Sequence, residues 1–173
     1  MTIAQGYQTL TDVWVKAAVE FSAHQTFGGD IQRTQQALSQ GKADAWEYLL
    51  HSLAQQIGAY LGRTDPTVKT VYMVEAEEPV EFGEAELTGR PAGINLIAWV
   101  ERKTAALMAL TKALEASLAE SRRALGCVKA KPECFFLDVH LVDDADVHER
   151  RGYGVLVNSV HVEPMKIWTR PVN

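Results

Sequence analysis

The fold is decided by residues 133–168, ECFFLDVHLVDDADVHERRGYGVLVNSVHVEPMKIW, near the end of a chain of 173 residues. Runs of β-branched and aromatic residues that alternate with polar ones are typical of strands. The pattern predicts two strands, 134–142 and about 154–168, joined by a connection that is first acidic and then basic. Because consecutive strands usually lie side by side, we expect these two to pair as a closing hairpin.

The residues before this stretch predict three helices, two strands and one long helix. Apolar residues recur at helical spacing over 9–23, 31–40 and 43–61, and again over 101–125, which is rich in Ala, Leu, Glu and Arg. The runs TVKTVYMVE at 67–75 and INLIAWV at 94–100 are short and β-branched, as strands are. Apolar side chains on both faces of 94–100 indicate a central or doubly covered strand.

Several residues are placed to begin or end the predicted helices. Asp30 is expected to cap the helix over 31–40, and Gly41 to end it. Asp44, followed by Glu47 three residues later, resembles a capping box for the helix over 43–61. Gly62 is expected just after the last turn of that helix.

These elements predict a single α+β domain over 1–173. Residues 1–63 form a helical segment and residues 64–173 a sheet segment. The sheet segment has the order ββαββ, and its simplest assembly is a mostly antiparallel sheet of about four strands, packed by the one long helix. The N-terminal helices form a layer that precedes it.

Composition and charge exclude some classes of protein and favour others. The chain is 47% hydrophobic and 23% charged, as globular proteins are, and its formal net charge is −5. A net negative charge argues against nucleic acid as the main partner and against an electrostatic hold on an anionic membrane. The sequence has neither an apolar run long enough to span a membrane nor a signal peptide, so we expect a cytoplasmic protein.

Two cysteines and a run of glutamates give only weak chemical signals. Cys127 and Cys134 lack the second pair of ligands that a zinc site needs, so we interpret them as two ordinary thiols beside a loop. The glutamates between residues 75 and 86 have no fixed spacing, which favours a solvated loop over a cation site.

The predicted closing hairpin carries a polar row. Side chains alternate between the two faces of a strand, so Asp138 and His140 project away from the row that contains Leu137 and Val139. On the second strand His161 and Glu163 share one face. If the apolar rows of both strands meet the same core, Asp138, His140, His161 and Glu163 converge on the opposite face.

Two imidazoles and two carboxylates suit two kinds of chemistry. They are appropriate ligands for a divalent metal such as Zn, Mn or Fe. A histidine beside a carboxylate is also a general acid–base unit, because the carboxylate fixes the tautomer of the ring. The same residues also occur on solvent-facing sheets without any such role, and this alternative stays open.

The sequence contains no catalytic motif and therefore favours a binding or assembly protein that acts through protein–protein contacts. Trp99 and Ile97 lie opposite the main apolar row of their strand, and Met165, Ile167 and Trp168 extend the last strand. Exposed rows of this kind mark interfaces, so we expect a homo-oligomer or a protein partner. The alternative is a metal-assisted or acid–base enzyme that uses the four polar residues, and a third is a module that senses a small ligand.

Overall fold

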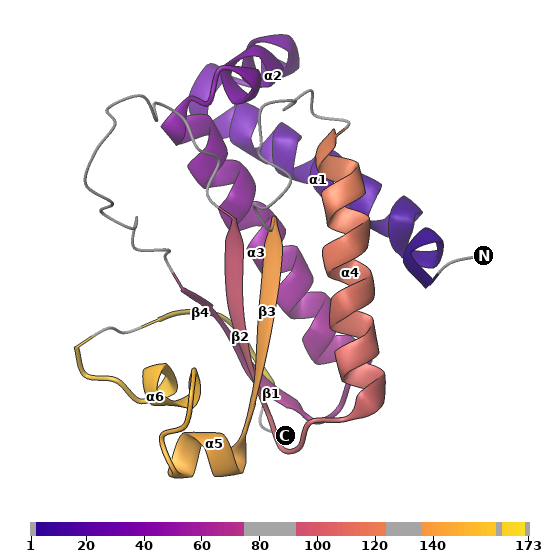
Figure 1. Ribbon diagram of the computed structural model, residues 1–173. Coiled ribbons are helices and arrows are strands. Elements are labelled where there is room, and N and C mark those ends of the chain that lie inside the picture. The colour runs from indigo at the N-terminus through magenta and orange to yellow at the C-terminus, as the bar shows by residue number, and fades with distance from the viewer. Residues whose placement is uncertain (1–2, 75–92, 124–135, 162–163, 172–173) are drawn as a thin grey trace, which may run out of the picture.

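The computed structural model describes residues 3–74, 93–123, 136–161 and 164–171 (Figure 1). The helices are α1 (Ile3–Phe27), α2 (Ile31–Ser39), α3 (Ala43–Thr64), α4 (Ala105–Arg123), α5 (Asp144–His148) and α6 (Gly154–Val157). The strands are β1 (Val68–Val74), β2 (Ile94–Val100), β3 (Leu137–Asp143) and β4 (Met165–Thr169). The predicted mixture of helices with a four-stranded sheet is confirmed.

The strands lie in the order β3-β2-β1-β4. β1 pairs antiparallel with both β2 and β4, whereas β2 pairs parallel with β3. The sheet is therefore mostly antiparallel, as predicted. The prediction that the last two strands pair as a closing hairpin is wrong, since β3 and β4 occupy opposite edges of the sheet. The chain passes through α4 between β2 and β3, and this crossover makes their pairing parallel.

The predicted strand over 154–168 is also wrong in its first part. Residues 154–157 form the short helix α6, and β4 begins only at Met165. The chain bends tightly here, because a Cβ added at Gly154 would lie 2.4 Å from the carbonyl oxygen of Asp146. Two short helices thus interrupt the simple ββαββ order that the sequence predicted.

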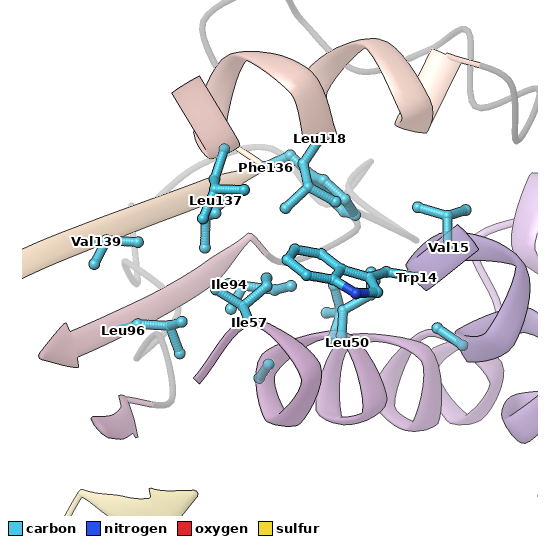
Figure 2. Packing of buried hydrophobic residues seen from close by; sticks show 14 of the residues in the cluster. Trp14, Val15, Leu50, Ile57, Ile94, Leu96, Leu118, Phe136, Leu137 and Val139 are labelled. Carbon is cyan, nitrogen blue, oxygen red and sulfur yellow. The ribbon is translucent and has the colours of Figure 1, made fainter. Parts of the chain in front are cut away.

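Helices cover one face of the sheet in two layers. α3 packs against β1, β2 and β4, α4 packs against β3, and α1 lies behind them against both helices (Figure 1). The main core fills the space between these layers; Trp14, Ile57, Leu96, Leu118 and Leu137 are among the side chains that Figure 2 shows packed there. Among the described residues, no helix is long and apolar enough to cross a membrane.

A second and smaller cluster covers part of the other face of the sheet. Tyr72, Ile97 and Val142 project from three strands and pack against Val147 of α5 and Val157 of α6. The expectation that the β2 strand is covered on both faces is therefore confirmed. The segment that contains α5 and α6 lies over the end of β3, on the side of the sheet away from α4 (Figure 1).

The contact between α3 and β4 depends on two glycines. A Cβ at Gly58 would lie 3.0 Å from the side chain of Ile167, and one at Gly62 would lie 2.3 Å from the ring of Trp168. The sequence placed Gly62 after the helix, but α3 continues to Thr64. Gly62 is needed because the indole ring occupies the space where a side chain would begin.

The ends of the helices follow the predicted caps in part. Asp30 caps α2 by accepting a hydrogen bond from the N–H of Arg33, and Gly41 after it has a φ of 71°. The predicted capping box at Asp44 is wrong, because the N-cap residue of α3 is Lys42, two residues earlier, and Lys42 makes no side-chain cap bond. α4 begins later than predicted, after Thr104 accepts a hydrogen bond from the N–H of Leu107.

Candidate functional site

Two of the four predicted site residues lie on β3 and touch each other. Leu137 and Val139 pack in the main core, and Asp138 and His140 project from the opposite face, as the alternation of side chains predicted. The Nε2 atom of His140 lies 3.2 Å from Oδ2 of Asp138, and both side chains are partly exposed. Among the described residues, this pair is the part of the predicted site that comes together.

The other two predicted residues are placed differently. His161 lies in the exposed segment before β4, where its own N–H donates to the hydroxyl of Ser159. Glu163 falls outside the described residues. Within the described part of the chain, no three histidine, cysteine, aspartate or glutamate side chains lie close enough to hold a metal ion. The hairpin that was expected to join all four residues is absent, and their convergence remains a prediction.

The ring of His140 is covered by an aromatic side chain that the sequence did not predict. Tyr153 stacks on it with ring centroids 3.7 Å apart and an angle of 14° between the planes. The backbone between α5 and α6 turns sharply to place Tyr153 there, since Arg150 and Gly152 have φ values of 54° and 49°. A positive φ is uncommon in a residue other than glycine.

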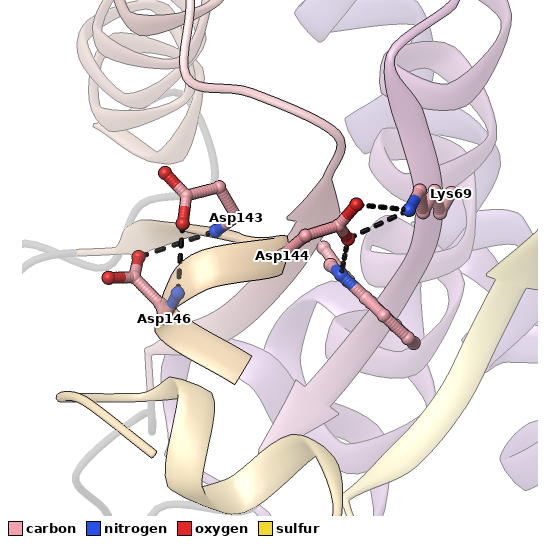
Figure 3. A network of polar contacts seen from close by, with 5 residues as sticks. Lys69, Asp143, Asp144 and Asp146 are labelled. Atoms are coloured by element: carbon pink, nitrogen blue, oxygen red, sulfur yellow. Dashed lines mark hydrogen bonds and ion pairs between the residues drawn. The ribbon is translucent and has the colours of Figure 1, made fainter. Parts of the chain in front are cut away.

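An acidic run fixes the start of α5 and ties it to the rest of the protein. Asp143 and Asp146 form a capping box, in which each side chain accepts a hydrogen bond from the other's backbone N–H (Figure 3). Asp146 also forms an ion pair with Lys103 at 2.5 Å. The hydrogen bond from Lys103 lowers the pKa of Asp146 below its usual value.

A second ion pair joins α5 to β1. Lys69 donates to both carboxylate oxygens of Asp144 at 2.7 Å, and the indole N–H of Trp99 donates to the same carboxylate at 2.8 Å (Figure 3). The bond from Lys69 is the main cause of a lowered pKa at Asp144. Asp144 and Asp146 thus pair with lysines far away in the chain, and Arg151 pairs with Glu149.

The outer edge of β3, the side away from β2, presents a row of backbone groups. In a strand, the N–H groups of alternate residues point to opposite sides. The N–H of Ile94 on β2 donates to the carbonyl of Phe136, so the odd-numbered residues of β3 point outward. The outward N–H groups belong to Leu137, Val139, Leu141 and Asp143.

Carboxylates occupy two of these outward positions. The N–H of Val139 donates to Glu115 of α4 at 3.1 Å, and the N–H of Asp143 donates to Asp146 at 3.3 Å. Each carboxylate is in turn paired with a lysine, because Lys112 lies 2.7 Å from Glu115 and Lys103 binds Asp146. Between them, the outward N–H of Leu141 has no acceptor among the described residues.

An open cavity of about 430 Å³ lies along this edge. Its floor is formed by residues 139–142 of β3, and its walls come from α4 with Lys103 before it, and from α5 with the connection to α6. We call it the edge cavity. The described side chains that line its walls are Lys103, Met108, Thr111, Lys112, Asp146, Arg151 and Tyr153. Met108 and Tyr153 are apolar or aromatic and yet 54% and 44% exposed.

The residues of the edge cavity could not be predicted from the sequence, because they come from three separate segments of the chain. A helix face, a strand edge and a turn meet only after the crossover through α4 has placed β3 at the edge of the sheet. The spacing of Asp143 and Asp146 directly after a strand was a usable signal, since it is that of a capping box. Cys127, Cys134 and the glutamates of 75–86 lie outside the described residues.

Comparisons with known proteins identify no relative. No family model, no curated protein and no solved structure matches the chain.

Proposed function

We propose that the protein is a binding module that acts through protein–protein contacts and receives a short extended segment of its partner in the edge cavity. The observation that carries the proposal is the outward N–H of Leu141, which has no acceptor among the described residues and lies on the floor of a cavity. Unpaired backbone groups at a sheet edge are a template for an added extended chain. A groove between an edge strand and a helix offers both backbone bonds and side-chain contacts.

The walls of the cavity support an occupant with an apolar side chain. Met108 of α4 and Tyr153 of the α5–α6 connection stand on its two sides, and both side chains are exposed. Methionine and tyrosine are enriched at interfaces, because one adapts its shape and the other combines an aromatic ring with a hydroxyl. Burying them is the main gain that binding would bring.

The segment that fits is short. Glu115 and Asp146 already hold the outward N–H groups of Val139 and Asp143, so a long added strand would have to displace both carboxylates. A segment that pairs with Leu141 alone leaves both in place. This arrangement also protects the edge from indiscriminate pairing with other strands.

Peptide selection tests the proposal. Random heptapeptides would be displayed in two libraries, one with free N-termini and one with free C-termini, and selected on the purified protein. We expect enriched peptides whose binding weakens about tenfold in Met108→Glu, because a charge then stands in the apolar wall. Val13→Glu is the matched control, since Val13 is an exposed apolar helix residue outside the cavity. Enriched peptides that bind Met108→Glu as well as the wild type would contradict the proposal.

The partner can be a second copy of the chain, which would make the protein the homo-oligomer that the sequence predicts. Static light scattering across a range of concentrations tests this form of the proposal. A dimer that Met108→Glu dissolves and Val13→Glu leaves intact would identify the partner. A monomer at all concentrations would leave a different protein as the partner.

A second candidate function rests on the contact between Asp138 and His140. A carboxylate 3.2 Å from an imidazole is a general acid–base pair, and a metal held with His161 and Glu163 is its metal-assisted form. Hydrolysis of p-nitrophenyl acetate by the wild type and by His140→Gln tests the acid–base form, and equal rates would contradict it. Elemental analysis of protein purified without a histidine tag tests the metal form, and the absence of transition metal would contradict it.

A further inference from the structure

We propose that the segment bound in the edge cavity is a chain end, and that its terminal carboxylate accepts the hydrogen bond from the N–H of Leu141. The inference rests on the proposed function and names the chemistry of its ligand. Three observations carry it: the pattern of acceptors along β3, the charge of the cavity walls and the blocked positions on either side.

The first observation is that the protein uses carboxylates as acceptors along this edge. The N–H groups two residues before and two residues after Leu141 each donate to a carboxylate. Both carboxylates come from side chains that reach over the edge, and each is neutralised by a lysine. A carboxylate at Leu141 repeats the same arrangement with a group from outside the chain. Hydrogen bonds to an ionised acceptor are stronger than those to a neutral carbonyl.

The second observation is the charge of the cavity walls. Lys103, Lys112, Arg151 and Asp146 line the cavity, and the carboxylate of Glu115 lies beside its floor at Val139. Each of the three cations is bound to one carboxylate, and a lysine ammonium has three donors. A ligand carboxylate that lies between Lys103 and Lys112 is attracted by both without breaking either existing pair.

The third observation is that the chain of the ligand cannot continue along the edge. Glu115 occupies the position on one side of Leu141, and Asp146 occupies the position on the other. A carboxylate on an internal aspartate or glutamate would require the ligand backbone to pass one of these side chains. A terminal residue avoids this conflict, because its carboxylate reaches Leu141 while its side chain packs against Met108 or Tyr153.

Three small probes test the inference by NMR on ¹⁵N-labelled protein. N-acetylphenylalanine carries the terminal carboxylate, its primary amide lacks the charge, and N-acetyl-aspartyl-phenylalaninamide carries a side-chain carboxylate only. We expect the free acid to shift the amide signal of Leu141 and to bind about tenfold more tightly than either of the other two. Equal binding of the acid and the primary amide would show that the protein does not recognise the carboxylate. Equal binding of the acid and the aspartyl probe would show that the carboxylate need not belong to a chain end. Either result would overturn the inference.

Two variants test the donors independently of the probes. Lys112→Met should weaken binding of the free acid severalfold and leave binding of the amide unchanged, whereas Lys166→Met, an exposed lysine on β4, should change neither. Leu141→Pro removes the outward N–H without touching the ladder to β2, and it should abolish the preference for the acid. If Leu141→Pro does not fold, the comparison of Lys112→Met with Lys166→Met still tests the inference. A loss of affinity in Lys112→Met that is equal for the acid and the amide would overturn it.

The peptide libraries separate this inference from the function on which it rests. If both hold, enriched peptides come from the library with free C-termini. Peptides from the library with free N-termini alone, with binding that depends on Met108, would support the binding module and overturn the terminal carboxylate. A failure of both libraries, together with no shift of the Leu141 amide by any probe, would overturn both.

Discussion

The two edges of the sheet are finished in different ways. β4 is pressed onto α3, where Ile167 and Trp168 fit against Gly58 and Gly62. Arg170 then ties the strand end to α3 and β1, donating to the carbonyls of Gly62, Asp65 and Val68 at 2.9 Å each. Along the outer side of β3, two of the four outward N–H groups, those of Val139 and Asp143, are held by side-chain carboxylates, and the one at Leu141 is left without an acceptor among the described residues.

The difference indicates how each edge strand is held against the rest of the protein. Close packing on glycine leaves no room for an added atom between β4 and α3, which makes that contact sensitive to substitution. The acceptors on β3 are side chains rather than backbone groups, so we expect that edge to tolerate substitution better. Substitutions at the two edges should therefore have effects of different size and kind.

The largest effect is expected at the β4 edge from Gly62→Ala. The new methyl group would lie 2.3 Å from the ring of Trp168, so the strand must move or the ring must rotate. Overpacking of this kind costs about 3 kcal/mol, of which better helix propensity returns about 1 kcal/mol. Urea denaturation should show a net loss in the free energy of unfolding.

Gly6→Ala is the matched control for that substitution. Gly6 also lies in a helix, but nothing is within 4 Å of its added Cβ, so the same change should stabilise the protein or leave it unaltered. If Gly62→Ala were as stable as Gly6→Ala, the close packing of β4 on α3 would be disproved.

Arg170→Ala should have the next largest effect. Three carbonyl groups at the end of α3 and the start of β1 lose a charged donor, which costs about 2 kcal/mol because Arg170 is partly buried. Arg170→Lys should recover only part of the loss, since lysine lacks the planar fork of donors. Arg63→Ala is the control, because Arg63 is an exposed arginine in the last turn of α3, and it should change stability little.

At the β3 edge, Glu115→Ala should cost less, about 1 kcal/mol. The N–H of Val139 loses its acceptor but gains access to solvent, and Lys112 loses its partner. Hydrogen exchange at the Val139 amide should accelerate, and Glu115→Gln should restore part of the protection because its amide oxygen still accepts. Unchanged exchange in Glu115→Ala would mean that Glu115 does not hold this edge.

The smallest effect is the pH dependence contributed by Asp144. Its pKa is lowered from the usual 3.8 in the folded protein, so its pair with Lys69 stabilises the protein above that pH. The contribution is lost as the pH falls through the folded pKa. Since both side chains are substantially exposed, we expect only about 0.5 kcal/mol.

Denaturation of wild type and Asp144→Asn between pH 2 and pH 7 measures that contribution. The two curves should differ near neutral pH and converge in acid, and high salt should reduce the difference. A difference that persists at the lowest pH would contradict this prediction, because Asp144 would then stabilise the protein through something other than its charge. The hydrogen bond from Trp99 cannot account for such a difference, since the amide oxygen of asparagine also accepts it.

Most elements of the fold follow from local patterns in the sequence. Helical spacing located α1, α2 and α3, and β-branched runs located β1 and β2 with nearly their observed bounds. The pairing of the last strands could not be obtained in this way, because it depends on where α4 carries the chain. Residues 154–157 have the composition of a strand, but they form a helical turn that begins where Gly154 lies close against the backbone of Asp146.

The candidate site was predictable only where it depends on a single strand. Alternation of side chains placed Asp138 and His140 on one face correctly, and their contact follows from that placement. The edge cavity depends on tertiary structure at every point. Glu115 has the helical periodicity of a surface residue, and nothing in its neighbourhood indicates that it accepts a hydrogen bond from a strand residue 24 positions away.

The pairing of Thr70 with Thr169 has a consequence for how the protein folds. Contacts between residues so far apart in sequence form late, because a long loop must close before they bring any gain in free energy. β1 and β2 can pair before β4 arrives, which leaves one side of β1 open until the final step. The ring of Trp168 packs against Gly62 in that step, so its fluorescence should report the slowest phase of folding.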